Sequence, residues 1–284
     1  LIETLNIPVA LTWGASDLIP FDHKLYVGTF GTHGMRHANF AVQNADLILS
    51  FGSRLDTKST GSPINTFARE ARKIVVDIDP SELKKFNKFG LSMDLLIQQD
   101  LRDIFPQIYN NIDSISLTGN KKWLGKIEFW NENLNIEEKI SCPDGYIDPY
   151  KFFNILSNLV KNDSNFFIDT GCSIAWSMQV LRIKPEQRVF HDFNNTAMGW
   201  ALPASIGGYF ADSKKNLICI IGDGSFMMTL QELATIKHHA IPIKIILINN
   251  SGYSMIKQTQ DQWLSSNYVA SSVEGGLSFP VYEN

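Results

Sequence analysis

The sequence predicts an α/β protein built from two domains, each with a parallel β-sheet. Apolar segments of strand length alternate with segments of helical period in both halves of the chain. Strands that are separated by helices form parallel βαβ units. A length of 284 residues, 44% of them hydrophobic, suits two globular domains of this kind.

The first half of the chain alternates strands and helices in order. Strands are predicted at residues 7–12, 46–51 and 73–78, with helices near 36–43 and 64–71. We expect residues 1–112 to form a first domain that is truncated at its start. Residues 113–145 then form a linker with a helix that carries Trp123 and Trp130, and the segment SCPDG at 141–145 ends regular structure.

Residues 146–284 are expected to form the second domain, truncated at its end. A helix begins after Pro149, and strands are predicted at 165–169, 216–221 and 243–248. The strand at 216–221 runs into Gly222-Asp223-Gly224-Ser225 and then into an amphipathic helix. The strand at 243–248 runs into Asn249-Asn250.

These two strand ends predict a magnesium–diphosphate site. Neighbouring parallel strands place Asp223 and Asn250 together at the carboxyl edge of the sheet, where α/β proteins bind ligands. A carboxylate, an amide oxygen and a backbone carbonyl suit Mg²⁺, which completes its shell with phosphates. We expect Ser225 to cap the helix and the glycines to let the backbone approach the diphosphate. Each half of the pattern alone is common in ordinary turns, so the combination carries the prediction.

The pattern resembles the thiamine diphosphate motif of thiamine-dependent enzymes, which begins with GDG and ends with NN. The resemblance implies that Asp223, Asn250 and the carbonyl of Gly252 hold Mg²⁺. The thiamine diphosphate residues that it implies are Gly171, Cys172, Ser173, Met198, Gly222, Asp223, Gly224, Ser225, Asn250, Tyr253 and Met255.

Two further segments of this half resemble acetolactate synthases and their relatives. Asp169-Thr-Gly-Cys-Ser173 is similar to a loop whose two residues after glycine touch the cofactor phosphates, although the family often has glutamine and histidine there. The alternative is an ordinary helix N-terminus. Met198 lies in a segment similar to Met-Gly-x-x-Leu-Pro, whose methionine supports the bent cofactor, and its alternative role is that of a core residue.

The first half resembles the central, FAD/NAD-like domain of acetolactate synthase. The matching segments include Gly31-Thr-His-Gly34, Gly52-Ser-Arg54 and Val76-Asp-Ile-Asp-Pro80. Several relatives keep this fold without FAD, and Asp56-Thr57-Lys58 replaces a family Asp-Asp-Arg, so flavin occupancy stays open. The FAD residues that the resemblance implies are His33, Gly34, Gly52, Arg54, Asp77, Ile78 and Asp100.

The resemblance spans the central and C-terminal domains of a three-domain acetolactate synthase large subunit. It implies decarboxylation of pyruvate and carboligation to a second 2-oxo acid, with branched-chain amino acids as the pathway. The family's activating glutamate belongs to an N-terminal domain that this chain lacks, so we assign no catalytic residue and expect the chain alone to be inactive. Thr259 stands where branched-chain synthases have a tryptophan, which leaves the acceptor open. The alternatives are another thiamine-dependent 2-oxo acid decarboxylase or carboligase and a non-catalytic cofactor-binding subunit.

Composition and the cysteine spacing argue against several classes of partner and site. A formal charge of −4 gives no reason to expect nucleic acid or a membrane surface as partner. Because no apolar run reaches membrane-spanning length and no secretory leader is present, we expect a cytoplasmic or organelle-matrix protein. Cys142, Cys172 and Cys219 lack zinc or redox spacing. The resemblance implies small 2-oxo acid substrates, a homodimer or homotetramer, and a regulatory subunit.

Overall fold

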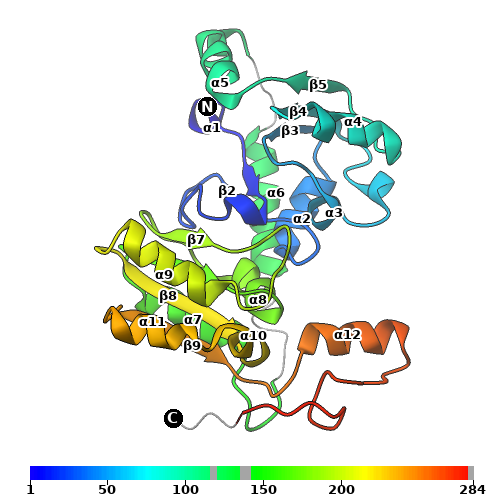
Figure 1. Cartoon of the computed structure of the whole chain (residues 1–284). Coiled ribbons are helices and arrows are strands. Elements are labelled where there is room, and N and C mark those ends of the chain that lie inside the picture. The colour runs from blue at the N-terminus through cyan, green and yellow to red at the C-terminus, as the bar shows by residue number, and fades with distance from the viewer. Residues whose placement is uncertain (116–119, 135–141, 281–284) are drawn as a thin grey trace. The chain divides into compact units, whose positions relative to one another are not determined.

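The computed structural model describes residues 1–115, 120–134 and 142–280 (Figure 1). The chain divides into two compact units, Leu1–Asp148 and Pro149–Asn284. Every strand pair in the described sheets is parallel, which confirms the predicted fold class. No helix in the described ranges is long and apolar enough to cross a membrane.

The first unit contains two parallel sheets, with β1 beside β2 and with the strand order β3-β4-β5. Helix α6 packs on α2, and its Ile127 belongs to the core that also contains Phe30, Phe67 and Phe86. The elements of this unit are α1 (Ile2–Leu5), β1 (Val9–Leu11), β2 (Tyr26–Thr29), α2 (Arg36–Gln43), β3 (Leu47–Phe51), α3 (Thr57–Thr60), β4 (Arg72–Asp77), α4 (Pro80–Lys88), β5 (Leu95–Gln98), α5 (Leu101–Asn110) and α6 (Asn120–Asn133).

The helix predicted near residues 64–71 is wrong. The structure has only a 3-10 turn at Ile64–Thr66, and Ala68 takes a left-handed φ of 41°. The amide of Ala68 donates to the side chain of Gln43 at 2.8 Å rather than to a helical carbonyl. Phe67 and Ala68 are nevertheless buried, because this irregular loop lies in the core. The helix-like apolar spacing therefore reflected burial of a loop.

The second unit has one four-stranded parallel sheet with the order β7-β6-β8-β9. Its elements are α7 (Pro149–Leu159), β6 (Ser164–Ile168), α8 (Cys172–Val180), β7 (Arg188–Phe190), α9 (Ala201–Ala211), β8 (Asn216–Gly222), α10 (Asp223–Thr229), α11 (Glu232–His238), β9 (Ile243–Ile248) and α12 (Ser254–Trp263). The single amphipathic helix predicted after residue 225 is two helices, α10 and α11, interrupted at Leu230–Gln231.

Both faces of β8 are buried, as expected of a central parallel strand. Leu217, Cys219 and Ile221 point into a core shared with α9, which packs across β6 and β8 (Figure 1). A Cβ on Gly208 of α9 would lie 2.3 Å from Cζ of Phe167, so this glycine lets α9 lie close to the sheet. Because β6 and β9 are the parallel neighbours of β8, the carboxyl ends of these three strands lie at the same edge of the sheet.

Candidate functional site

The carboxyl ends of β8 and β9 bring Asp223 and Asn250 together. Gly222 is paired with Ile248 in the sheet, so the chain leaves both strands at the same level. Asp223 is 2% exposed, and its Oδ1 accepts a hydrogen bond from the amide of Gly224 at 2.8 Å. Its Oδ2 accepts one from the amide of Asn250 at 3.3 Å. The carboxylate thus joins the two halves of the sequence pattern.

The oxygen atoms at this edge fit a magnesium ion. Asn250 donates through Nδ2 to Oγ of Ser254 at 2.7 Å, which leaves Oδ1 as the ligating atom of its amide. Gly252 is buried in the same turn, two residues further on. No group of three or more His, Cys, Asp or Glu residues in the described chain is arranged to hold a metal. One carboxylate, one amide and one carbonyl form a hard-oxygen set, which Mg²⁺ prefers.

One expectation about the GDGS turn is wrong. Helix α10 begins at Asp223 with Gly222 as its N-cap, so Ser225 lies inside the first turn and does not cap the helix. Its side chain instead forms a hydrogen bond with Asp169. A Cβ on Gly224 would lie 2.0 Å from Cε1 of Tyr253, so this glycine lets the backbone approach an aromatic ring of its own chain. The predicted approach of the glycines to a diphosphate stays a prediction.

Asp169 is a residue of the site that the sequence reasoning quoted but did not select. It follows β6 directly and is 1% exposed. Its carboxylate accepts hydrogen bonds from the amides of Gly199 at 3.1 Å and Ala201 at 2.9 Å. Burial raises the pKa of Asp169, and the hydrogen bonds it accepts oppose that shift. A carboxylate immediately after a buried central strand was the signal that could have identified it.

The hydrogen bonds that Asp169 accepts from Gly199 and Ala201 hold the loop that carries Met198. Gly199 has a φ of 83°, and a Cβ there would lie 2.9 Å from Cβ of Met228 on α10. Thr229 donates from Oγ1 to the carbonyl of Gly199 at 3.1 Å. The Met198 side chain itself stays 37% exposed. The loop is therefore held from two sides, while its methionine remains accessible.

The loop after β6 also reaches this edge. Gly171 is the N-cap of α8, with a φ of 83°, and a Cβ there would lie 3.9 Å from Cγ of Met255. Burial raises the pKa of the Cys172 thiol. Ser173 is only 3% exposed. The structure thus places the predicted Gly171 and Met255 side by side, with Cys172 partly accessible and Ser173 largely covered.

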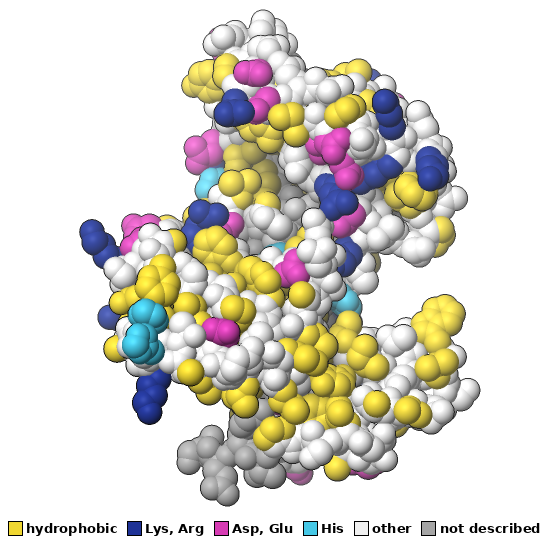
Figure 2. Space-filling model, viewed as in Figure 1, with side chains coloured by type: hydrophobic (Ala, Val, Ile, Leu, Met, Phe, Trp, Pro, Cys, Tyr) yellow, Lys and Arg dark blue, Asp and Glu magenta, His cyan; other side chains and the backbone are white. Residues whose placement is uncertain are grey.

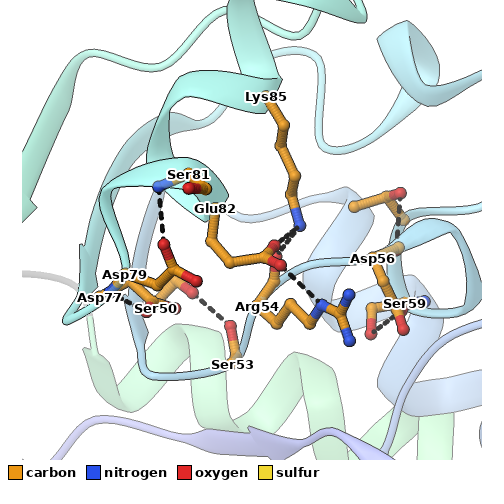
Figure 3. A network of polar contacts seen from close by, with 11 residues as sticks. Ser50, Ser53, Arg54, Asp56, Ser59, Asp77, Asp79, Ser81, Glu82 and Lys85 are labelled. Carbon is orange, nitrogen blue, oxygen red and sulfur yellow. Dashed lines mark hydrogen bonds and ion pairs between the residues drawn. The ribbon is translucent and has the colours of Figure 1, made fainter. Parts of the chain in front are cut away.

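In the first unit, the predicted flavin residues after β3 and β4 lie at one sheet edge (Figure 3). The amide of Gly52 donates to the carbonyl of Val76 at 2.9 Å. Nε of Arg54 donates to Oε1 of Glu82 at 3.0 Å, and Lys85 forms an ion pair with the same carboxylate. The Arg54 guanidinium, which the resemblance assigns to a diphosphate, is therefore already bound to an internal anion.

The remaining flavin residues are distributed over this unit. Asp77 accepts the amide of Asp79 at 3.0 Å, and Ile78 is 63% exposed. Asp100, after β5, caps α5 and forms an ion pair with Arg102 at 2.7 Å. The loop after β2 holds the other two: the ring of His33 stacks on Trp13 with centroids 5.7 Å apart, and a Cβ on Gly34 would lie 2.5 Å from backbone atoms of Phe30.

Comparison with known proteins gives matches along most of the chain. Residues 1–108 match the central domain of thiamine pyrophosphate enzymes, and residues 169–281 match their C-terminal TPP binding domain. The chain is 32% identical over 278 residues to an acetolactate synthase large subunit of Cyanidium caldarium, covering 97% of this chain and 46% of that protein. It is 30% identical over 279 residues to acetolactate synthase isozyme 2 large subunit of Escherichia coli, covering 98% and 48%.

The chain spans about half the length of the curated relatives that it matches. Its two matched segments correspond to two successive domains of one kind of enzyme, in the order expected from the sequence. The parallel sheets and the Asp223–Asn250 contact agree with that assignment. The chain belongs to the thiamine pyrophosphate enzyme family and comprises its central and C-terminal TPP-binding domains.

Proposed function

We propose that this chain is part of an acetolactate synthase-like enzyme that binds thiamine diphosphate and Mg²⁺. Its reaction is decarboxylation of pyruvate, followed by carboligation to a second 2-oxo acid. The observation that carries the proposal is the Asp223–Asn250 contact at the carboxyl edge of β8 and β9, with Gly252 in the same turn. The names of the similar proteins support the same reaction.

In this proposal the second unit binds and orients the cofactor. Asp223, Asn250 Oδ1 and the Gly252 carbonyl would hold the magnesium ion together with the diphosphate. Met198 and Met255 would support the cofactor with polarizable thioethers. When bound, thiamine diphosphate supplies the carbanion chemistry that removes carbon dioxide and forms the new carbon–carbon bond. No residue of this chain is assigned a proton-transfer role, because the family's activating glutamate belongs to another domain.

Thr259 lies at the position that we propose to influence which second substrate accepts the new carbon–carbon bond. Its Oγ1 donates to the carbonyl of Met255 at 3.1 Å, so the hydroxyl is used within α12. The residue is exposed, which leaves room where synthases of branched-chain precursors carry a tryptophan. We therefore include acceptors other than pyruvate in the test below.

The test uses the full-length protein. Thiamine diphosphate binding is titrated at several Mg²⁺ concentrations for the wild type, for Asp223→Asn and for the control Asp212→Asn, an exposed aspartate at the end of α9. Removing a charged ligand should weaken Mg²⁺-dependent binding by roughly tenfold or more, whereas the control should match the wild type. Absence of binding in the wild type would refute the proposal.

Product analysis separates the rival enzymes. Acetolactate formed from pyruvate supports the synthase. Acetaldehyde without acetolactate would identify a 2-oxo acid decarboxylase, and a mixed product with another aldehyde or oxo acid would identify a different carboligase. Cofactor binding without turnover of any 2-oxo acid would identify a non-catalytic subunit.

The proposal for FAD depends on Arg54. A flavin diphosphate at the edge of β3 and β4 competes with Glu82 for the charge of the Arg54 guanidinium, whose Nε already donates to that carboxylate (Figure 3). The visible absorbance of the purified full-length protein measures flavin occupancy directly. A flavin-free protein that retains no flavin absorbance after incubation with FAD and removal of the free flavin would contradict the FAD proposal.

We also propose that the enzyme is a homodimer or homotetramer. Hydrophobic side chains gather on the surface over α10 and α12 (Figure 2). On these helices, the side chain of Met228 in α10 is 50% exposed and that of Trp263 in α12 is 78% exposed. Large apolar patches commonly mark subunit contacts. The relatives are named large subunits, so a regulatory subunit is a further proposed partner. Sedimentation analysis of the full-length protein tests the oligomer, because a stable monomer would contradict it.

A further inference from the structure

We propose that Gln260 and Ser271 form a buried latch that positions the turn containing Gly252 for metal binding. Gln260 lies on α12, and Ser271 lies in the segment that follows this helix. The inference rests on the proposed function, because it assigns these two residues to the Mg²⁺ site. Neither contacts the metal ligands through its own side chain, so both are positioning residues.

The first part of the latch is a side-chain amide that is bonded through both its nitrogen and its oxygen. Gln260 is 7% exposed, whereas Gln258 on the same helix is exposed to solvent. Nε2 of Gln260 donates to the carbonyl of Val269 at 3.0 Å, and Oε1 accepts a hydrogen bond from the Ser271 hydroxyl. Ser271 has no exposed surface. A buried polar pair of this kind is costly unless both members are bonded, so each holds the other in place.

The second part connects Ser271 to the metal turn. The backbone carbonyl of Ser271 accepts a hydrogen bond from the amide of Tyr253 at 2.9 Å. Gly252 forms an isolated antiparallel bridge with Ser272, and a Cβ on Gly252 would lie 3.1 Å from the Ser271 carbonyl oxygen. The residue before Gly252 is Ser251, which takes a left-handed φ of 52°. Non-glycine residues keep this conformation where the surroundings impose it.

The segment that carries Ser271 is itself closed. The amide of Ala270 donates to the carbonyl of Gly275 at 2.9 Å, and a Cβ on Gly275 would lie 1.7 Å from the carbonyl oxygen of Tyr268. Nζ of Lys257 lies over the ring of Tyr268, 5.1 Å from its centroid. Several contacts thus join helix α12 to the following segment, including a hydrogen bond from the Tyr268 hydroxyl to Asp261, and the Gln260–Ser271 pair is a buried one.

The consequence for the metal follows from its coordination. Mg²⁺ demands near-octahedral geometry, so a shift in one carbonyl ligand lowers its affinity. Removal of the Gln260 amide takes away the hydrogen-bond partner of the buried Ser271 hydroxyl and breaks the part-buried bond to the Val269 carbonyl. The segment then relaxes, and with it the Ser271 carbonyl that holds Tyr253. Supporting groups of this kind commonly change metal affinity by about 10–100-fold.

The experiment measures the Mg²⁺ requirement for thiamine diphosphate binding to the full-length protein. Gln260→Leu keeps the volume but removes both hydrogen bonds, Ser271→Ala removes one, and Gln258→Leu is the matched exposed control. We expect Gln260→Leu to raise the half-saturating Mg²⁺ concentration by about tenfold, with full binding restored by excess Mg²⁺. Ser271→Ala should produce a smaller shift, and the double variant should add little to Gln260→Leu.

Hydrogen exchange at the Tyr253 amide is the second readout. It should accelerate in Gln260→Leu and Ser271→Ala and remain slow in Gln258→Leu. An unchanged Mg²⁺ requirement in Gln260→Leu, with normal binding by the wild type, would overturn the latch alone. A lower melting temperature with no change in Mg²⁺ requirement would overturn it too, because it shows a purely structural role. Absence of Mg²⁺-dependent binding in the wild type would instead overturn the proposed function, and the latch with it.

Discussion

Replacement of Asp169 by asparagine tests how the site is built, without any cofactor. The carboxylate accepts hydrogen bonds from the amides of Gly199 and Ala201, and it is 1% exposed. An asparagine oxygen can accept one of these amides, but its NH₂ group then faces the other donor. One buried backbone N–H is left without an acceptor.

The magnitude follows from these contacts. Hydrogen bonds to a charged acceptor contribute about 1.5–3 kcal/mol each, and an unsatisfied buried donor costs about 1–3 kcal/mol. The variant also avoids the cost of burying a charge, which is the main cause of the raised pKa of Asp169. We therefore expect a net loss of about 1–3 kcal/mol in the free energy of unfolding.

Urea unfolding followed by circular dichroism measures this loss as a lower midpoint at an unchanged slope. Asp163→Asn is the matched control, because Asp163 is exposed before β6 and its carboxylate accepts an exposed hydrogen bond from the side chain of Asn216. This variant should stay within about 0.5 kcal/mol of the wild type. Equal midpoints for Asp169→Asn and the wild type would refute the role of Asp169.

The pH dependence of the same difference is a second check. Because the folded pKa of Asp169 is raised above 3.8, the folded state holds this proton more tightly than the unfolded state. The stabilising contribution of protonated Asp169 is complete below pH 3.8 and is lost as the pH rises through the folded pKa. Asp169→Asn should lack this loss, so its stability should change less with pH in that window.

Three further predictions concern other contacts. Gly224→Ala should destabilise the protein by about 1–3 kcal/mol in urea unfolding, because the new Cβ meets the Tyr253 ring, and adding Tyr253→Ala should recover part of the loss. Burial lowers the pKa of His37 below 6.5, so the stabilising contribution of neutral His37 is present above pH 6.5 and is lost as the pH falls through the lowered pKa. The free energy of unfolding of His37→Gln should therefore fall less towards acid pH than that of the wild type. The same pH dependence in both proteins would contradict this prediction. Glu82→Gln should strengthen FAD binding by about tenfold in a fluorescence titration, because the diphosphate no longer competes with a carboxylate for Arg54; equal affinities would exclude competition.

Strongly periodic segments were predictable from the sequence. The apolar runs at β3, β4, β8 and β9 and the amphipathic helix α2 occur where their patterns indicate them. The prediction of a helix near residues 64–71 failed, because a loop buried on one side shows the same apolar spacing as a helix. Periodicity reports burial, and it reports secondary structure only when the backbone is regular.

The site, too, was predictable in one respect and not in another. Strand ends and their polar residues were enough to bring Asp223 and Asn250 together, because adjacent parallel strands end at one edge. The sequence did not reveal that Ser225 bonds to Asp169 rather than capping α10. Which of several nearby polar groups a hydroxyl chooses depends on distances set by the packing of two loops.

By itself, then, the sequence determined the parallel α/β class, the family and the residues at the strand ends. These follow from local periodicity and from motifs contained in short segments. Only the tertiary structure decided three contacts: the ion pair between Glu82 and Arg54, the close approach of the Tyr253 ring to Gly224, and the hydrogen bond between Gln260 and Ser271. Each of these contacts joins residues far enough apart in the chain that their meeting depends on how whole elements pack, which no local pattern records.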